Sequence, residues 1–149
     1  MSINWVMVRE EAPVPLPGEV FTLYQPQVSL KLECLSAPQS SPTIDSSSGT
    51  VFVSAQRIVY LAKKPVTYHI PDRGDRNFES LTTPIDSIRE PRVVSPWFGP
   101  YKWECMFKGA GSQGGLEGQW RLRFTFNDGG VVKFNEFFTN LQTLPPYPG

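Results

Sequence analysis

Prolines and glycines are spread so densely through the chain that long helices have little room to form. The 149 residues include fifteen prolines and twelve glycines. Proline lacks a backbone N–H and fixes φ, and glycine in a helix interior costs conformational entropy, so both residues favour turns. We therefore expect many short strands joined by turns.

Length and charge restrict the organisation further. A chain of 149 residues can bury one sizeable core, which predicts a single domain over residues 1–149, with an extended proline-rich lead-in (about 1–18) and a short tail (about 144–149). Fourteen basic and fourteen acidic side chains give a formal net charge of zero. Because no bulk positive field results, nucleic acid is not expected as a partner.

Several segments have the composition and alternation of strands. Residues 49–64, GTVFVSAQRIVYLAKK, predict an antiparallel hairpin turning near Ser54 to Gln56, and residues 28–34 alternate apolar and polar side chains. The segments YKWECMFKG, QWRLRFTF and VVKFNEFF predict further strands, with NDGG as a tight turn between the last two. Only NEFFTNLQTL reads as helical, with one apolar stripe formed by Phe137, Phe138, Leu141 and Leu144.

This pattern predicts a mainly β fold of about seven antiparallel strands, closed by one C-terminal helix. Phe138 and Leu141 lie three residues apart in that helix, so we expect them to be buried on a shared face. The predicted core or its rim comprises Val51, Val53, Ile58, Tyr60, Trp120, Phe124 and Phe126.

The sequence contains no recognisable catalytic constellation. Its one histidine, His69, lies in the polar segment VTYHIPDRGDR, which favours a surface or strand-edge position. Gly109, Gly111 and Gly114 match G-x-G-x-x-G, but a strand-like segment follows them, so a hairpin loop is favoured over a nucleotide site. Cys34 and Cys105 are too few for a disulfide framework or a zinc site and are expected to be buried thiols. We expect no enzyme activity, no cofactor and no metal.

Two surface features have competing interpretations. Lys63, Lys64, Arg73 and Arg76 could hold an anionic lipid head group or phosphate, but acidic residues are interleaved with them, which favours a mixed, solvated surface. The aromatic stretch PWFGPYKW could form an exposed platform. Core and turn packing is the favoured interpretation for its four large aromatic residues, Trp97, Phe98, Tyr101 and Trp103.

The order of three motifs resembles a known family. GTVFVSAQRIVYLAKK, SPWFGPYKWECMFKGAGSQGG and WRLRFTFNDGGVVKF, within roughly residues 19–143, resemble the GRAM domain family of WW-domain-binding protein 2, in particular its fungal branch. Arg57 matches an arginine of that family's hairpin. The resemblance implies a pleckstrin-homology-like sandwich and a non-enzymatic adaptor. Lipid binding and transcriptional co-regulation are its alternative implications.

The end of the chain reads as a peptide ligand. The family carries P-P-x-Y ligands for WW domains, whereas Leu144, Pro145, Pro146 and Tyr147 here form an L-P-x-Y variant. A WW domain clamps proline between aromatic rings and takes the tyrosine in a separate pocket. The implied partner is a WW-domain protein such as a HECT-type ubiquitin ligase. The alternative is a disordered tail whose prolines merely end the helix.

The amino terminus bears on where the protein acts. It has no long apolar run, and a charged residue already occurs at Arg9. Both features argue against a signal peptide or a transmembrane segment. We expect a cytoplasmic protein, and the family resemblance extends this expectation to the nucleus.

Overall fold

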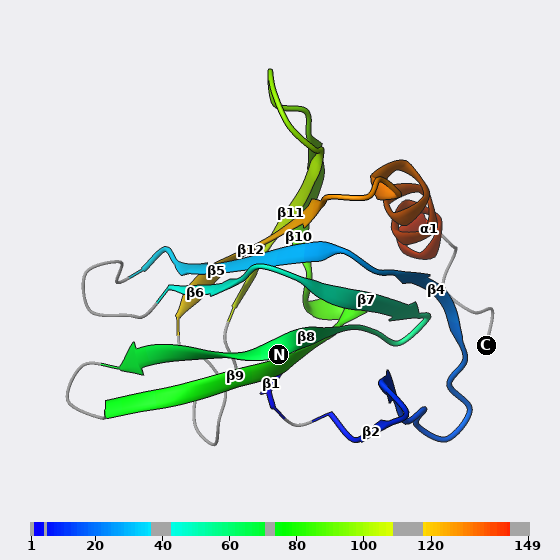
Figure 1. Ribbon diagram of the computed structural model, residues 1–149. Helices are drawn as coiled ribbons and strands as arrows, with labels where there is room; N and C mark the ends of the chain where they lie inside the picture. Colours follow the sequence, from blue (N-terminus) through cyan, green and yellow to red (C-terminus); the bar gives the residue numbers. More distant parts are fainter. Residues whose placement is uncertain (1, 5, 37–42, 71–73, 109–117, 144–149) are drawn as a thin grey trace.

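Two five-stranded antiparallel sheets pack together, and one helix lies at an end of the pair (Figure 1). The computed structural model describes residues 2–4, 6–36, 43–70, 74–108 and 118–143. These residues form twelve strands, three of them only two residues long, against about seven expected. The predicted mainly β fold with a C-terminal helix is confirmed.

Sheet 1 has the strand order β1-β9-β8-β7-β4. The predicted hairpin over residues 49–64 is confirmed as β7 and the first part of β8, and β8 continues into a long pairing with β9. The strands of sheet 1 are β1 (Ser2–Ile3), β4 (Phe21–Gln25), β7 (Gly49–Ser54), β8 (Arg57–Ile70) and β9 (Gly74–Pro84).

Sheet 2 has the order β10-β11-β12-β5-β6. A 3₁₀ turn, η1 (Ile85–Ser87), leads from sheet 1 into β10. The strands of sheet 2 are β5 (Val28–Cys34), β6 (Ile44–Ser46), β10 (Arg89–Val94), β11 (Lys102–Lys108) and β12 (Gln119–Phe126). Side chains on β5 and β12 alternate between buried and partly exposed positions, as expected when only one sheet face meets the core.

A chain of aromatic rings crosses the core from sheet 1 to the helix. Tyr60 stacks on Phe78 and on Phe124, with ring centroids 6.2 and 5.7 Å apart. Trp103 stacks on Phe124 at 6.0 Å and meets Phe134 edge-on at 4.9 Å. All seven predicted core residues are buried: Val51, Val53, Ile58, Tyr60, Trp120, Phe124 and Phe126.

The prediction of a strand at VVKFNEFF is wrong, because this segment opens helix α1 (Val131–Thr143). The Phe134 N–H donates to the Gly130 carbonyl, which is the first turn of helical bonding. Val131 and Phe134 are buried while Val132 is exposed, a spacing of three that suits a helix and not a strand. The predicted burial of Phe138 and Leu141 concerns side chains outside the described part. Among the described residues, no helix is long and apolar enough to cross a membrane.

The lead-in, predicted as an extended proline-rich segment, contains a short piece of paired strand. A two-stranded ribbon forms between β2 (Val8–Arg9) and β3 (Ala12–Pro13). The Val14 N–H also donates to the Met7 carbonyl at 2.7 Å. The pairing stays short because Pro13 and its neighbouring prolines cannot donate.

Candidate functional site

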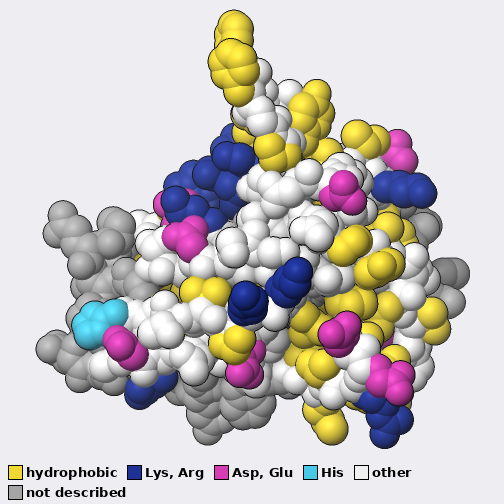
Figure 2. Space-filling view, viewed as in Figure 1, with side chains coloured by type: hydrophobic (Ala, Val, Ile, Leu, Met, Phe, Trp, Pro, Cys, Tyr) yellow, Lys and Arg dark blue, Asp and Glu magenta, His cyan; other side chains and the backbone are white. Residues whose placement is uncertain are grey.

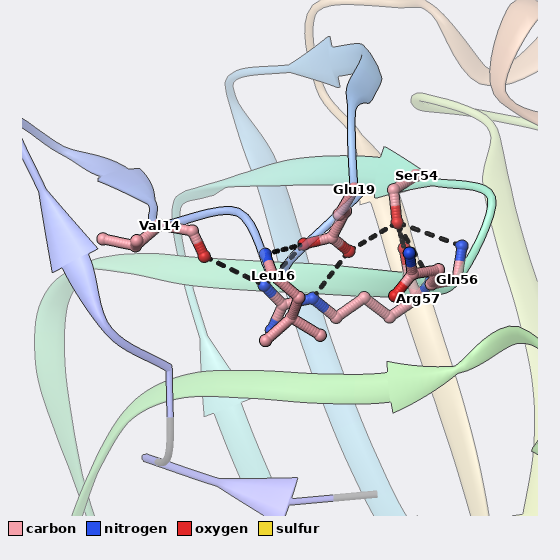
Figure 3. Close-up of polar contacts among 6 residues, drawn as sticks. All are labelled: Val14, Leu16, Glu19, Ser54, Gln56 and Arg57. Atoms are coloured by element: carbon pink, nitrogen blue, oxygen red, sulfur yellow. Dashed lines mark hydrogen bonds and ion pairs between the residues drawn. The ribbon is translucent and has the colours of Figure 1, made fainter.

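A buried ion pair ties the lead-in to the β7–β8 hairpin (Figure 3). Arg57, the first residue of β8, donates from Nε and Nη2 to the two carboxylate oxygens of Glu19, both at 2.9 Å. Ser54 Oγ donates to the same carboxylate at 2.7 Å, and the Leu16 N–H donates to it at 2.9 Å. Arg57 Nη2 also donates to the Val14 carbonyl at 3.2 Å. We call Glu19, Ser54 and Arg57 the clamp.

The clamp keeps its carboxylate ionised. Burial by itself raises the pKa of Glu19, but the hydrogen bonds from Arg57, Ser54 and the Leu16 backbone, together with the charge of Arg57, outweigh it and lower the pKa. Both carboxylate oxygens already accept hydrogen bonds from this chain. The clamp is therefore a brace for the lead-in, which gives a structural role to the arginine that the family resemblance singled out.

The braced lead-in helps to form a groove on sheet 1. The volume of this groove is about 600 Å³. Val6 and Val8 line it from the lead-in, and Tyr24 and Phe52 line it from β4 and β7. The rings of Tyr24 and Phe52 stack with centroids 5.8 Å apart, and the Tyr24 side chain stays well exposed. The groove thus offers an aromatic surface to solvent.

A second candidate surface is the turn between β10 and β11. Trp97 is 97% exposed and Phe98 is 90% exposed, so the favoured expectation of core or turn packing is wrong for both residues. It is right for Trp103, which is fully buried. We call Trp97 and Phe98 the aromatic tip; in Figure 2, hydrophobic side chains gather at the free end of the projection at the top of the molecule. The flanking prolines in PWFGP were the available sequence signal, since they prevent this segment from joining a sheet.

The basic residues considered as a possible lipid or phosphate site are spread along the β8–β9 hairpin. Lys63 lines the groove, and Lys64, the next residue of β8, is exposed. Arg76 on β9 pairs with Tyr68 on β8. Tyr68 lies five residues after Lys63, which is roughly 16 Å along the strand. Arg73 lies outside the described residues. The structure does not bring Lys63 and Arg76 together. Phosphate binding by this set stays the less favoured alternative to a solvated surface.

His69 lies on β8, not in the polar turn suggested by its neighbours. Its Nδ1 is 2.9 Å from the Asp75 carboxylate on β9, and both side chains are exposed. The position is that of a strand histidine at the surface, which agrees with the favoured interpretation.

The cysteines match their prediction. Cys34 and Cys105 are both buried, and burial, with the nearby Glu104 charge, raises the pKa of the Cys105 thiol. A thiol held protonated in this way is a poor nucleophile.

Two predicted motifs lie outside the described residues. They are the glycine pattern at Gly109, Gly111 and Gly114 and the tail ligand Leu144, Pro145, Pro146 and Tyr147. The strands on either side of the glycine pattern, β11 and β12, pair antiparallel.

Comparison with known structures identifies the architecture. The N-terminal PH domain of Vps36 superposes with a TM-score of 0.62, at 16% identity, over 94% of this chain and 92% of that domain. The fold is that of a pleckstrin-homology (PH) domain. A chain of the 8S snRNP assembly intermediate is similar as well, with a TM-score of 0.52 at 12% identity, over 93% of this chain and 94% of that one.

Sequence comparison adds a relative from yeast. A UPF0664 stress-induced protein of Schizosaccharomyces pombe is 24% identical over 143 residues, which cover 95% of this chain and 76% of the yeast protein. No protein-family model matches the chain. Membership of the GRAM family named above therefore stays a prediction.

Proposed function

We propose that this protein is a non-enzymatic adaptor that presents its C-terminal Leu-Pro-Pro-Tyr motif to a WW domain. The observation that carries the proposal is the position of the motif in the sequence. Helix α1 ends at Thr143, and the four motif residues follow at once as Leu144, Pro145, Pro146 and Tyr147. A proline pair at this point ends a helix and favours the polyproline II conformation that WW grooves bind.

The start of the helix that precedes this motif packs on the core of the PH-like domain. The buried core extends through Phe134 of α1, so the helix that precedes the motif is held against Trp103 and Phe126. The groove beside Tyr24 is the surface that we assign to a second protein partner. The adaptor would thereby link a WW-domain protein, such as a HECT-type ubiquitin ligase, to the second protein that binds in the groove.

Titration of the full chain against a panel of WW domains tests this proposal. Wild type should bind at least one member, and Tyr147→Ala should abolish that binding because the partner loses its tyrosine contact. Pro145→Ala should weaken it. Pro148→Ala, a change one residue beyond the motif, is the matched control and should leave the affinity unchanged.

Thermal unfolding distinguishes a tail that binds a partner from a tail that stabilises the folded domain. An adaptor tail predicts equal melting temperatures for wild type and Tyr147→Ala. A lower melting temperature combined with unchanged WW binding, or an absence of WW binding by wild type, would reject the proposal.

Membrane lipid binding is a second candidate function, and the aromatic tip favours it. The aromatic tip, Trp97 and Phe98, is separate in sequence from the basic residues of the β8–β9 hairpin, such as Lys63 and Arg76.

A further inference from the structure

The β10–β11 turn holds its aromatic tip away from the body of the protein (Figures 1 and 2). Gly99 follows Phe98 with φ of +92°, and a Cβ there would meet no atom within 4 Å. The base of the turn is fixed by the Phe126 N–H, which donates to the Tyr101 carbonyl at 3.0 Å. With Pro96 and Pro100 on either side, the turn is preorganised and needs little ordering when it binds.

Charged side chains on the outer face of sheet 2 form a row behind the tip. The strand register places Arg92, Glu104, Arg123 and Lys31 side by side across β10, β11, β12 and β5. Lys102 lies on the same face one pair nearer the tip, because it is two residues from Glu104 on β11. We call Lys31, Arg92, Lys102 and Arg123 the basic row.

The row also holds two acidic residues. Asp45 on β6 pairs with Lys31 and is exposed, whereas Glu104 is covered by its arginines. Glu104 accepts hydrogen bonds from Arg92 Nε and from Arg123 Nε at 3.0 Å, and its side chain is only 4% exposed while that of Arg92 is 64% exposed. Burial raises the pKa of Glu104, but the two arginines outweigh this and lower it. Solvent therefore meets guanidinium groups. Figure 2 shows Lys and Arg side chains clustered beside the base of the projection.

The sequence of the hairpin keeps acidic charge away from its end. From Val93 to Trp103 the chain reads VVSPWFGPYKW, with no aspartate or glutamate. Val93 and Tyr101 are also exposed, which widens the apolar end of the hairpin. The order along the hairpin is thus exposed aromatic residues first and cations behind them.

We propose that the aromatic tip inserts into the surface of an anionic lipid bilayer while the basic row faces the head groups. Tryptophan and other amphipathic aromatic residues favour the membrane interface, and each Lys or Arg near an anionic surface adds attraction. The tip is convex, so it can enter a fluid surface without a complementary cavity. A protein partner would have to supply such a cavity.

Co-sedimentation of the full chain with vesicles tests the insertion. Wild type should bind phosphatidylcholine vesicles that contain phosphatidylserine and should bind phosphatidylcholine alone weakly. Trp97→Ala and Phe98→Ala should each lower the affinity on the order of tenfold, from the apolar area that no longer leaves water. Val132→Ala, which trims an exposed apolar residue on α1, is the matched control and should bind as wild type does.

The cation contribution has its own variant. Lys102→Gln should lower affinity for the phosphatidylserine vesicles about fivefold, the equivalent of one lysine near an anionic surface. Added salt should weaken vesicle binding by wild type. It should also reduce the difference in affinity between wild type and Lys102→Gln. Tyr147→Ala should bind vesicles normally, because the tail is not involved, so failure of the WW proposal leaves this test unaffected.

Three outcomes would overturn the membrane proposal. They are no binding of wild type to either vesicle, equal binding to both, and unchanged binding after Trp97→Ala and Phe98→Ala together. If the tip serves a protein contact with a second copy, sedimentation of wild type alone will show a concentration-dependent dimer that the double variant loses, with no vesicle binding. Melting curves of Trp97→Ala, Phe98→Ala and Val132→Ala should match wild type, since these three side chains are exposed.

Discussion

Trp97 and Trp103 lie six residues apart near the same hairpin, yet one is 97% exposed and the other is fully buried. Trp103 belongs to β11, where it points toward the core and packs on Phe124 and Phe134. Trp97 belongs to the turn, where no sheet face exists to cover it. The difference shows that secondary structure, and not aromatic character, decides which of these residues the fold uses.

The same difference separates stability from binding. A buried tryptophan contributes dispersion contacts and apolar burial to the folded state. An exposed pair of aromatic rings contributes little to folding and favours association, so its presence on a surface points to a binding role. We therefore expect substitutions at the two positions to affect different measurements.

The largest effect is expected at the core position. Trp103→Ala should cost about 3–5 kcal/mol of unfolding free energy, because the ring leaves a cavity among Phe124 and Phe134. Trp97→Ala should change it by less than about 0.5 kcal/mol. Denaturant unfolding of both variants measures the difference; similar costs at the two positions would break the comparison.

A buried charged residue extends the comparison of Trp97 with Trp103. It tests whether burial alone sets the loss of unfolding free energy. Glu19→Gln should cost about 3 kcal/mol, because Arg57 keeps its buried charge without a carboxylate partner. Glu33→Gln is the matched control. Its carboxylate is 3.9 Å from Arg121 in a partly exposed pair, and the expected cost is below about 1 kcal/mol. Equal midpoints for the two variants would contradict the role assigned to the clamp.

The clamp also predicts a pH dependence. The pKa of Glu19 is lowered in the folded protein, so its contribution to stability is present above the unfolded value near 4.5 and is lost as pH falls through the folded pKa. Wild type should lose unfolding free energy over this acidic range more steeply than Glu19→Gln. Parallel profiles from urea unfolding at a series of pH values would show that this carboxylate is not the group responsible.

The turn itself should give a smaller effect on stability. Gly99 has φ of +92°, so Gly99→Ala should cost about 1 kcal/mol through backbone strain alone, because its Cβ would have no close neighbour. Gly99→Asn should cost less, since asparagine tolerates positive φ better. Thermal unfolding compares the two, and equal melting temperatures would argue that the turn is not held in this conformation.

Local pattern predicted the fold well because strand alternation is a local property. Val51 and Val53, and likewise Phe124 and Phe126, were placed correctly by a period of two. Val131 and Val132 misled the same reasoning: β-branched residues suggested a strand, whereas the spacing of Val131 and Phe134 belongs to a helix.

The sites were harder to predict because they depend on contacts distant in sequence. Glu19 and Arg57 are 38 residues apart, and only the return of the lead-in to the β7–β8 hairpin brings them together. Glu104 is hidden by arginines from two neighbouring strands, which no local motif indicates. The aromatic tip had a local signal in its prolines, but the aromatic content itself suggested a core.

Tryptophan fluorescence tests the division between Trp97 and Trp103 most directly. Adding phosphatidylserine-containing vesicles should shift wild-type emission to shorter wavelength as Trp97 leaves water, while the buried Trp103 and Trp120 are already shielded. Trp97→Phe should remove most of this shift and should still bind the vesicles, because a phenyl ring can also insert. A shift of wild-type size in Trp97→Phe, or no shift in wild type, would contradict the assignment of this side chain to a membrane surface.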